Sequence, residues 1–339
     1  MERSGGAEVV VITGAAAGVG RAAAQAFGRR GAKVGLIARG GAGMDGLEGA
    51  RRDVEQAGGT ALVLPADVAN ADEVMAAAER AENELGPIDI WVNVAMATVF
   101  SPFKEMTPEE FKRATEVTYL GQVYGTMAAL KYMLPRDRGS IVQVGSALAY
   151  RSIPLQSAYC GAKAGIRGFT DSLRCELIHD RSHVRLCMVQ MPALNTPQFS
   201  WSATRMPRHP QPVPPIYQPE VAAEAIYFAA HHERRELRVG FSTLKAMVGN
   251  MVAPGLLDVY LARTGYDAQQ TAQPVSPDRP NNLWEPVPGD HGAHGIFDAR
   301  SRASSTELWL AEHARPLAAA VAGLGALGAA CATWARRSS

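Results

Sequence analysis

The sequence predicts an α/β protein with a doubly wound parallel sheet of seven strands and a C-terminal extension. From residue 9 to about 265, short runs rich in β-branched residues alternate with alanine-rich stretches of helical period. The first run leads into a glycine-rich turn and then a helix. Beyond residue 265, scattered prolines and polar residues replace this alternation, and the chain finishes in an apolar tail.

Seven segments have the composition of buried strands, at residues 9–13, 33–38, 61–66, 88–92, 140–144, 184–189 and 237–241. Their carboxyl ends should meet at one edge of the sheet, where open α/β folds bind ligands. We expect a short N-terminal tail at 1–8, a Rossmann-type domain at 9–265, a proline-rich arm at 266–315 and an apolar helix at 316–339.

Composition excludes several classes of protein. A formal net charge of +1 over 339 residues supplies no field to attract nucleic acid. The four cysteines form no CxxC pair and have no histidine at zinc-ligand spacing, so we expect no metal. The N-terminus lacks the pattern of an export signal, so we expect reduced thiols and a cytoplasmic location.

The turn after the first strand reads Thr-Gly-Ala-Ala-Ala-Gly-Val-Gly over residues 13–20. Gly14 permits a tight turn, Gly18 removes a side chain where a pyrophosphate approaches the backbone, and Gly20 allows close helix packing. A second GxGxxG match at 323–328 follows no strand and is rejected. We expect the first loop to bind a dinucleotide through Gly14, Ala16, Gly18, Val19 and Gly20.

The residue type after the second strand predicts which nucleotide binds. An acidic side chain there would accept hydrogen bonds from the ribose hydroxyls and repel a 2′-phosphate. This chain has Arg39 instead, whose planar, permanently charged guanidinium suits a phosphate. NADP(H) is therefore favoured over NAD(H), with a solvated surface arginine as the alternative interpretation.

Tyr159 and Lys163 are four residues apart at the start of a helical run, so they share one helix face. A phenol with a pKa near 10 exchanges protons poorly at neutral pH, and a nearby ammonium lowers that pKa. Ser146 ends the fifth strand at the edge where ligands bind, and its hydroxyl can hold a carbonyl oxygen. Together the three side chains predict acid/base catalysis at a carbonyl group.

These motifs, in this order, resemble the short-chain dehydrogenase/reductase family over about residues 8–245. The resemblance implies a seven-stranded Rossmann sheet in which Tyr159 donates the proton, Lys163 bonds the nicotinamide ribose and Ser146 contacts the substrate oxygen. It also implies that Asp67 and Val68 lie near the adenine.

The same resemblance suggests further cofactor contacts and three departures from the family pattern. Asn93, Pro192 and Thr196 are expected to bind the cofactor, the last two at the nicotinamide carboxamide and pyrophosphate. Thr118 stands where a helix asparagine usually completes a proton relay, and we expect its hydroxyl to serve there. Met96 adds bulk near the cofactor, and Ala193 replaces a common glycine.

Two segments beyond the core motifs bear on substrate and location. An insertion at 197–218 carries Phe199, Trp201, Met206 and Tyr217 where a lid would cover an apolar substrate, although these side chains could equally pack the lid onto the domain. Residues 317–335 carry no charge and are bracketed by arginines. This tail is either an anchor to the inner face of a membrane or a helix packed against a partner.

We therefore expect an oxidoreductase that transfers hydride between NADP(H) and a carbonyl or secondary alcohol of small molecules. The alternative is a nucleotide-binding scaffold or redox sensor without catalysis. The resemblance also implies a homodimer or homotetramer formed through helices at about 107–134 and 157–177, where Ala164, Gly165 and Gly168 would allow close approach.

Overall fold

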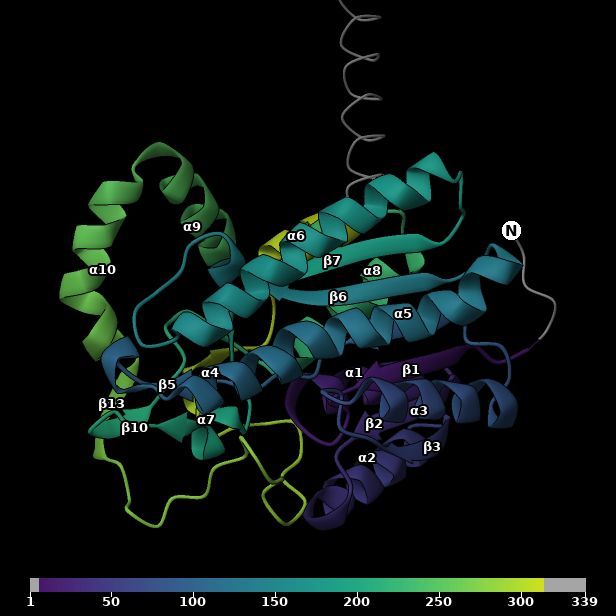
Figure 1. Ribbon diagram of the computed structural model, residues 1–339, viewed down its shortest axis with the longest axis horizontal. Helices are drawn as coiled ribbons and strands as arrows, with labels where there is room; N and C mark the ends of the chain where they lie inside the picture. The colour runs from purple at the N-terminus through teal and green to yellow at the C-terminus, as the bar shows by residue number, and fades with distance from the viewer. Residues whose placement is uncertain (1–5, 314–339) are drawn as a thin grey trace, which may run out of the picture.

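The structure, a computed structural model, describes residues 6–313 (Figure 1). Its central sheet has seven parallel strands in the order β12-β7-β6-β4-β1-β2-β3. The predicted seven-stranded sheet is thus confirmed. The strands are β1 (Val9–Thr13), β2 (Lys33–Ala38), β3 (Thr60–Pro65), β4 (Ile90–Asn93), β6 (Ser140–Ser146), β7 (Arg185–Met191) and β12 (Glu236–Arg238).

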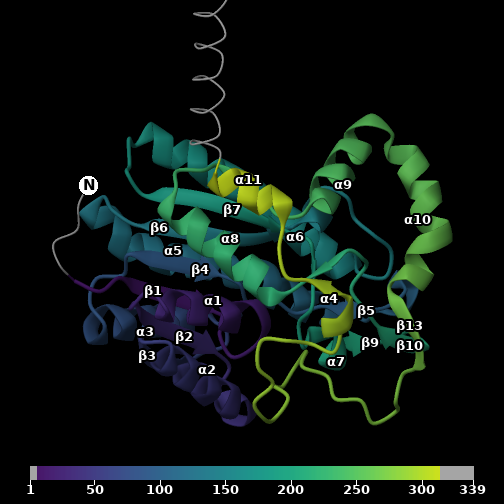
Figure 2. The same cartoon turned by 180° about the vertical axis from the view of Figure 1, so that it is seen from behind.

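Helices cover both faces of the sheet, which makes the fold doubly wound (Figures 1 and 2). One face carries α1 (Gly18–Gly28), α2 (Met44–Gln56) and α8 (Pro219–His231); the other carries α3 (Ala71–Glu84), α4 (Pro108–Thr115), α5 (Gly121–Met133) and α6 (Ser157–His179). Alternate side chains of β1 serve the two cores, since Val10 and Ile12 pack on one face and Val9 and Val11 on the other.

The helix expected at 107–134 is interrupted. Thr107 caps α4 in a capping box with Glu110, and a π-helical turn over Glu116–Leu120 separates α4 from α5. Such turns insert one extra residue into a helix and are frequent at functional sites. Thr118 lies inside this turn and is fully buried.

The C-terminal extension begins with a helical hairpin, α9 (Phe241–Val252) and α10 (Pro254–Ala268), so helix continues past residue 265. Strand β13 (Gln270–Pro274) then pairs antiparallel with β10 (Arg208–Pro210). The remaining elements are α7 (Gln198–Trp201), α11 (Thr306–Glu312), the strand pair β5 (Val99–Phe100) and β9 (Ala203–Thr204), and the sheet of β8 (Ala193–Leu194), β11 (Ile216–Tyr217) and β14 (Ser301–Arg302). Short 3₁₀ turns lie at Gly41–Gly43, Phe103–Glu105, Leu134–Arg136, Ala147–Ala149 and Asp298–Arg300.

Between β13 and β14 the chain runs as an extended arm, residues 275–300, along the carboxyl edge of the main sheet (Figure 2). Phe297 is buried in a cluster with Phe100 and Phe199. Leu283 is also buried, whereas its neighbour Trp284 remains half-exposed. The arm therefore packs against the rest of the domain through buried apolar side chains.

The predicted apolar tail, 316–339, lies outside the described residues. Within residues 6–313, none of the helices combines the length and the apolar character that crossing a membrane requires.

Candidate active site

A cavity of about 470 Å³ runs along the carboxyl edge of the sheet, a size typical of ligand sites. The glycine loop, the ends of β2, β4, β6 and β7, and the arm all contribute to its walls. Most of the predicted site residues line it, namely Gly14, Ala16, Gly18, Val19, Gly20, Arg39, Asp67, Val68, Ser146, Tyr159, Lys163, Pro192 and Thr196. Asn93 and Thr118 do not.

The glycine loop has the geometry that its sequence predicts. Gly14 has φ +71°, and a Cβ on it would lie 2.9 Å from the Cα atom of Ala95. A Cβ on Gly20 would lie 2.2 Å from the carbonyl oxygen of Gly14. The loop therefore accepts only glycine at these positions, and the N-terminus of α1 opens into the cavity, where its amides suit an anion.

Ser146 and Tyr159 meet at the other end of the cavity. Ser146 ends β6, and its Oγ accepts a hydrogen bond from the Leu148 amide at 3.1 Å, which fixes the hydroxyl. Burial raises the pKa of the Tyr159 phenol, and a hydrogen bond with the Ser146 side chain offsets part of that rise. The phenol is therefore protonated at neutral pH, the state that a proton donor to a carbonyl needs.

Lys163 lies beneath this pair. Its Nζ donates to the carbonyl oxygen of Val144 at 2.6 Å and lies 5.6 Å from the centre of the Tyr159 ring. Burial lowers the pKa of Lys163 to about 7. The expected lowering of the phenol pKa by this ammonium is not seen, because burial disfavours the charged form of both groups.

Asn93 and Thr118 belong to internal polar networks. The amide nitrogen of Asn93 donates to Thr126 and Gln143, and its oxygen accepts from Trp91 Nε1 at 2.8 Å. This network lies between the sheet and α5. Thr118 Oγ1 donates to the Ala97 carbonyl at 2.8 Å and accepts from the Ala97 amide at 2.9 Å. Since that proton is already committed, the hydroxyl has none to donate to a relay.

The arm reaches the end of the cavity where Arg39 lies. Arg39 donates to the carbonyl oxygens of Trp284 at 2.8 Å and Asn282 at 2.6 Å. Arg113 donates to the Leu283 carbonyl and also forms an ion pair with Asp67 at 2.5 Å. Sequence reasoning missed Arg113 and the arm, since no local spacing links residues 282–284 to the end of β2.

The arm also crosses the glycine loop. The amide of Gly18 donates to the carbonyl oxygen of Gly292 at 3.0 Å. Arg21, on the first turn of α1, pairs with Asp53 at 2.6 Å and with Asp290 of the arm. Two donors suited to anions, the Gly18 amide and the Arg39 guanidinium, therefore already hold arm carbonyls.

Apolar side chains dominate the opposite end, around Ser146 and Tyr159. The charged side chains among the described lining residues are Arg39, Asp67 and Lys163, together with the ionisable His291 of the arm. The lid contributes Phe199 and Trp201 to the cavity, whereas Met206 and Tyr217 are buried in packing roles. The lining at this end comes from Leu148, Ile153, Phe199, Pro212, Val213, Pro214, Ser242 and Ala246.

Comparison with known proteins agrees with this geometry. The family model of the short chain dehydrogenases matches residues 8–205, more than half of the chain. The chain belongs to the short-chain dehydrogenase/reductase family. It is thus an NAD(P)-dependent oxidoreductase by family.

Relatives within the short-chain dehydrogenase/reductase family extend the likeness beyond the matched domain. The uncharacterized oxidoreductase YxnA of Bacillus subtilis is 31% identical over 329 residues, covering 95% of this chain and 90% of that protein. An uncharacterized oxidoreductase of Mycobacterium tuberculosis is 30% identical over 256 residues, covering 74% of this chain and 72% of its own. A solved metagenomic short-chain oxidoreductase in complex with NADP has a TM-score of 0.56 and 25% identity, covering 68% of this chain and 96% of its own.

Proposed function

We propose that the protein transfers hydride between NADP(H) and an uncharged, apolar carbonyl compound or secondary alcohol. The observation that carries the proposal is one continuous cavity with two different ends. At one end Arg39 and the glycine loop offer donors to phosphate groups, and at the other Ser146 and Tyr159 bring two hydroxyls together among apolar side chains.

The choice of NADP(H) over NAD(H) rests on Arg39. Its guanidinium lines the cavity, and no acidic residue follows β2 in the segment 38–43 to repel a 2′-phosphate. Arg39 can bind this phosphate if the arm carbonyls of Asn282 and Trp284 give way. A phosphate oxygen carries more negative charge than a peptide carbonyl, so the exchange is favourable for the guanidinium.

The chain's own residues supply positioning and a proton. When bound, the nicotinamide supplies or accepts the hydride. Ser146, fixed by the Leu148 amide, holds the substrate oxygen, and Tyr159 gives its phenolic proton to that oxygen during reduction. Lys163 sits below Tyr159, where it can stabilise the phenolate that remains.

The same walls support the proposed substrate class. Beside Ser146 and Tyr159 the charged group is Lys163, whose Nζ is already bonded to the Val144 carbonyl, so a carboxylate or phosphate on the substrate would lose its hydration without gaining a free partner there. Gln156 and Gln211 also line the cavity, but their side-chain amides already donate to Gln269 and to the Ala268 carbonyl. An apolar ketone, aldehyde or secondary alcohol fits this lining.

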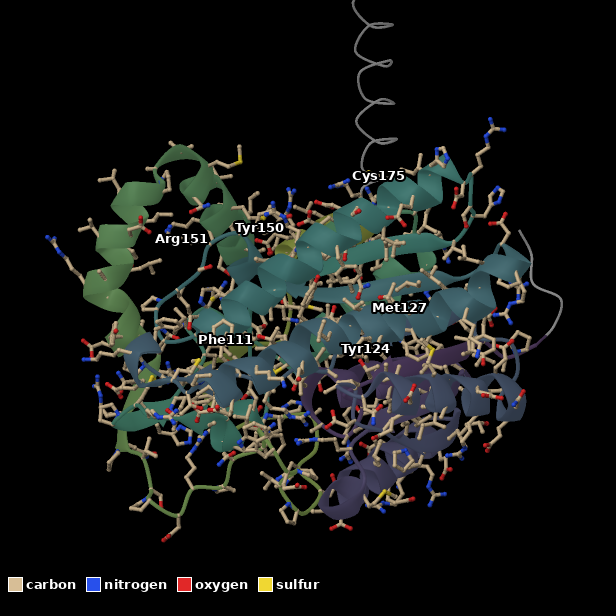
Figure 3. The ribbon with its side chains drawn as sticks, in the orientation of Figure 1. Phe111, Tyr124, Met127, Tyr150, Arg151 and Cys175 are labelled. Carbon is tan, nitrogen blue, oxygen red and sulfur yellow. The ribbon has the colours of Figure 1, made fainter. Side chains whose placement is uncertain are left out.

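Self-association is the second part of the proposal. Helices α4, α5 and α6 present the exposed side chains of Met127 and Cys175 and the part-exposed Tyr124 and Phe111 on one face (Figure 3). Gly168 of α6 has open space around its Cα, whereas Gly165 is needed for contact with Tyr119 of the same chain. We infer a homodimer or homotetramer that uses this face.

A paired binding and turnover assay tests the function. NADPH and NADH are titrated into the protein, and oxidation of each is followed over a panel of neutral ketones and aldehydes of increasing apolar size. We expect tighter binding of NADPH and turnover that favours uncharged, apolar substrates over their carboxylated analogues. Tight NADPH binding without turnover on any member of the panel would instead support a nucleotide-binding scaffold.

A further inference from the structure

The hairpin of α9 and α10 exposes many large apolar side chains to solvent. It projects from the side of the sheet, away from α2 and α3 (Figure 1). Three side chains at or near its turn are largely exposed, Met251 at 84%, Val252 at 78% and Leu256 at 74%. The same hairpin also exposes Phe241, Val248, Val259, Tyr260 and Tyr266.

This hairpin is held to the body at both ends. Arg151 donates to the side chains of Asn250 at 3.1 Å and Asp258 at 2.5 Å, next to the turn (Figure 3). At the base, the side chains of Gln156 and Gln269 share a buried hydrogen bond of 2.8 Å. The apolar surface is therefore presented by a positioned element.

The charges of the hairpin that lack a partner among the described residues are positive. Its two acidic residues, Asp258 and Asp267, are paired with Arg151 and Arg208 of the body. Lys245 and Arg263 are exposed and have no acidic partner within the part of the chain that the structure describes. Two copies of this face would bring like charges together, whereas an anionic surface would neutralise them.

The end of the described chain lies on the same side of the molecule. Helix α11 and the α9–α10 hairpin both lie on the upper side in Figure 2. Trp309 and Leu310 of α11 are each about half exposed. The sequence that follows α11 includes the uncharged run 317–335 and then Arg336 and Arg337.

We propose that the α9–α10 hairpin docks on an anionic lipid bilayer. Met251, Val252 and Leu256 enter the boundary between headgroups and acyl chains, and Lys245 and Arg263 contact lipid phosphates. Exposed apolar side chains beside unpaired cations are the combination that binds such surfaces.

Docking would also place the substrate end of the cavity beside the lipid. Ser242 and Ala246, on the same helix as Val248 and Met251, line that cavity. An uncharged, apolar substrate concentrates in bilayers, so the hairpin would face the phase that holds it. This consequence rests on the proposed function, whereas docking itself does not.

A fluorescence experiment on the full chain reports docking of the hairpin separately from any role of the tail. An environment-sensitive dye is attached at Met251→Cys, or at Gln56→Cys, an exposed position at the end of α2, as the control, with Cys175 and Cys331 replaced by serine. Cys160 and Cys187 are buried. The probes are vesicles of phosphatidylcholine with and without phosphatidylglycerol.

We expect a blue shift at position 251, and none at 56, with vesicles that contain phosphatidylglycerol, and a weaker shift at high salt. An unchanged spectrum at 251 would overturn the proposal, even if the full chain sediments with the vesicles. A dye at 251 that is already shielded in a vesicle-free dimer would assign the face to a second copy and would overturn it as well.

A triple variant gives an independent measure. Met251→Ser, Val252→Ser and Leu256→Ser together should weaken vesicle binding at least about tenfold, since each removes apolar area from the contact. Phe103→Ser, an exposed apolar residue before α4, is the matched control and should bind vesicles as the native chain does. Unaltered NADPH binding shows that the variants are folded, and unaltered vesicle binding by the triple variant would contradict the proposal.

Discussion

The Nζ atom of Lys163 lies 5.6 Å from the centre of the Tyr159 ring, one helical turn away along α6. Its hydrogen bond goes to the Val144 carbonyl, and both side chains lie in a cavity that disfavours their charged forms. Near neutral pH in the free protein the phenol is therefore neutral and Lys163 is close to the midpoint of its titration. A charge on Tyr159 must come with a compensating charge at the site.

This relationship predicts how stability depends on pH. Burial lowers the pKa of Lys163 from 10.5 to about 7. Between these values the unfolded lysine binds a proton that the folded one lacks, so the free energy of unfolding should rise with pH, by up to about 1 kcal/mol per pH unit. Urea unfolding of the native chain and of Lys163→Met from pH 7 to about 10 measures the difference. If the free energy of unfolding depended on pH in the same way in both proteins, the pKa of Lys163 would not be lowered by folding.

Replacing Arg39 tests the choice of nucleotide. Arg39→Leu should weaken NADPH binding by about tenfold or more, because a charge-assisted contact to the 2′-phosphate is lost. NADH binding should change much less. Since Arg39 also holds the arm, the readout is the ratio of the two dissociation constants, in which an effect of the arm cancels. Equal losses for both nucleotides would exclude a role for Arg39 in recognising the phosphate.

The arm should govern how fast the nucleotide exchanges. Asp290 ties the arm to Arg21 beside the glycine loop, and the Gly292 carbonyl occupies the Gly18 amide. Asp290→Asn should therefore speed both association and dissociation of NADPH severalfold, as measured by stopped-flow fluorescence. Asp278→Asn, at an exposed carboxylate of the same arm, is the control. Rates equal to those of the control would mean that the nucleotide enters without moving the arm.

Asn93 should matter for folding rather than for the cofactor. Its side chain bonds Trp91, Thr126 and Gln143 in a buried network, so Asn93→Ala leaves several polar groups without partners. We expect a loss of about 1–3 kcal/mol in the free energy of unfolding, with NADPH affinity unchanged. If Asn93→Ala bound NADPH more weakly but unfolded with the native free energy, Asn93 would act in cofactor binding instead.

Much of the fold could be predicted because its signals are local. Strands β1 and β2 have the predicted bounds, since continuous apolar runs end at a glycine turn or an arginine. The glycine loop and the Tyr159–Lys163 spacing also depend on neighbouring residues alone. Their convergence on one cavity follows from the parallel order of the strands.

The remaining features depend on contacts between distant segments. The arm returns to the glycine loop about 270 residues later, through Asp290 and Gly292, and nothing in its proline-rich composition indicates that destination. Leu283 is buried in this segment, whereas its larger neighbour Trp284 is half-exposed, so side-chain size does not indicate which residue docks the arm. For Asn93 and Thr118, position after a strand or in a helix could not reveal that backbone and amide partners already satisfy their side chains.

The most direct test of the central claim compares native protein with Tyr159→Phe on the best substrate of the carbonyl panel. The phenol is the proposed proton donor, so its loss should reduce kcat by about 10² to 10⁴ while the NADPH dissociation constant stays the same. Turnover by Tyr159→Phe at the native rate, with NADPH bound as tightly, would contradict the account.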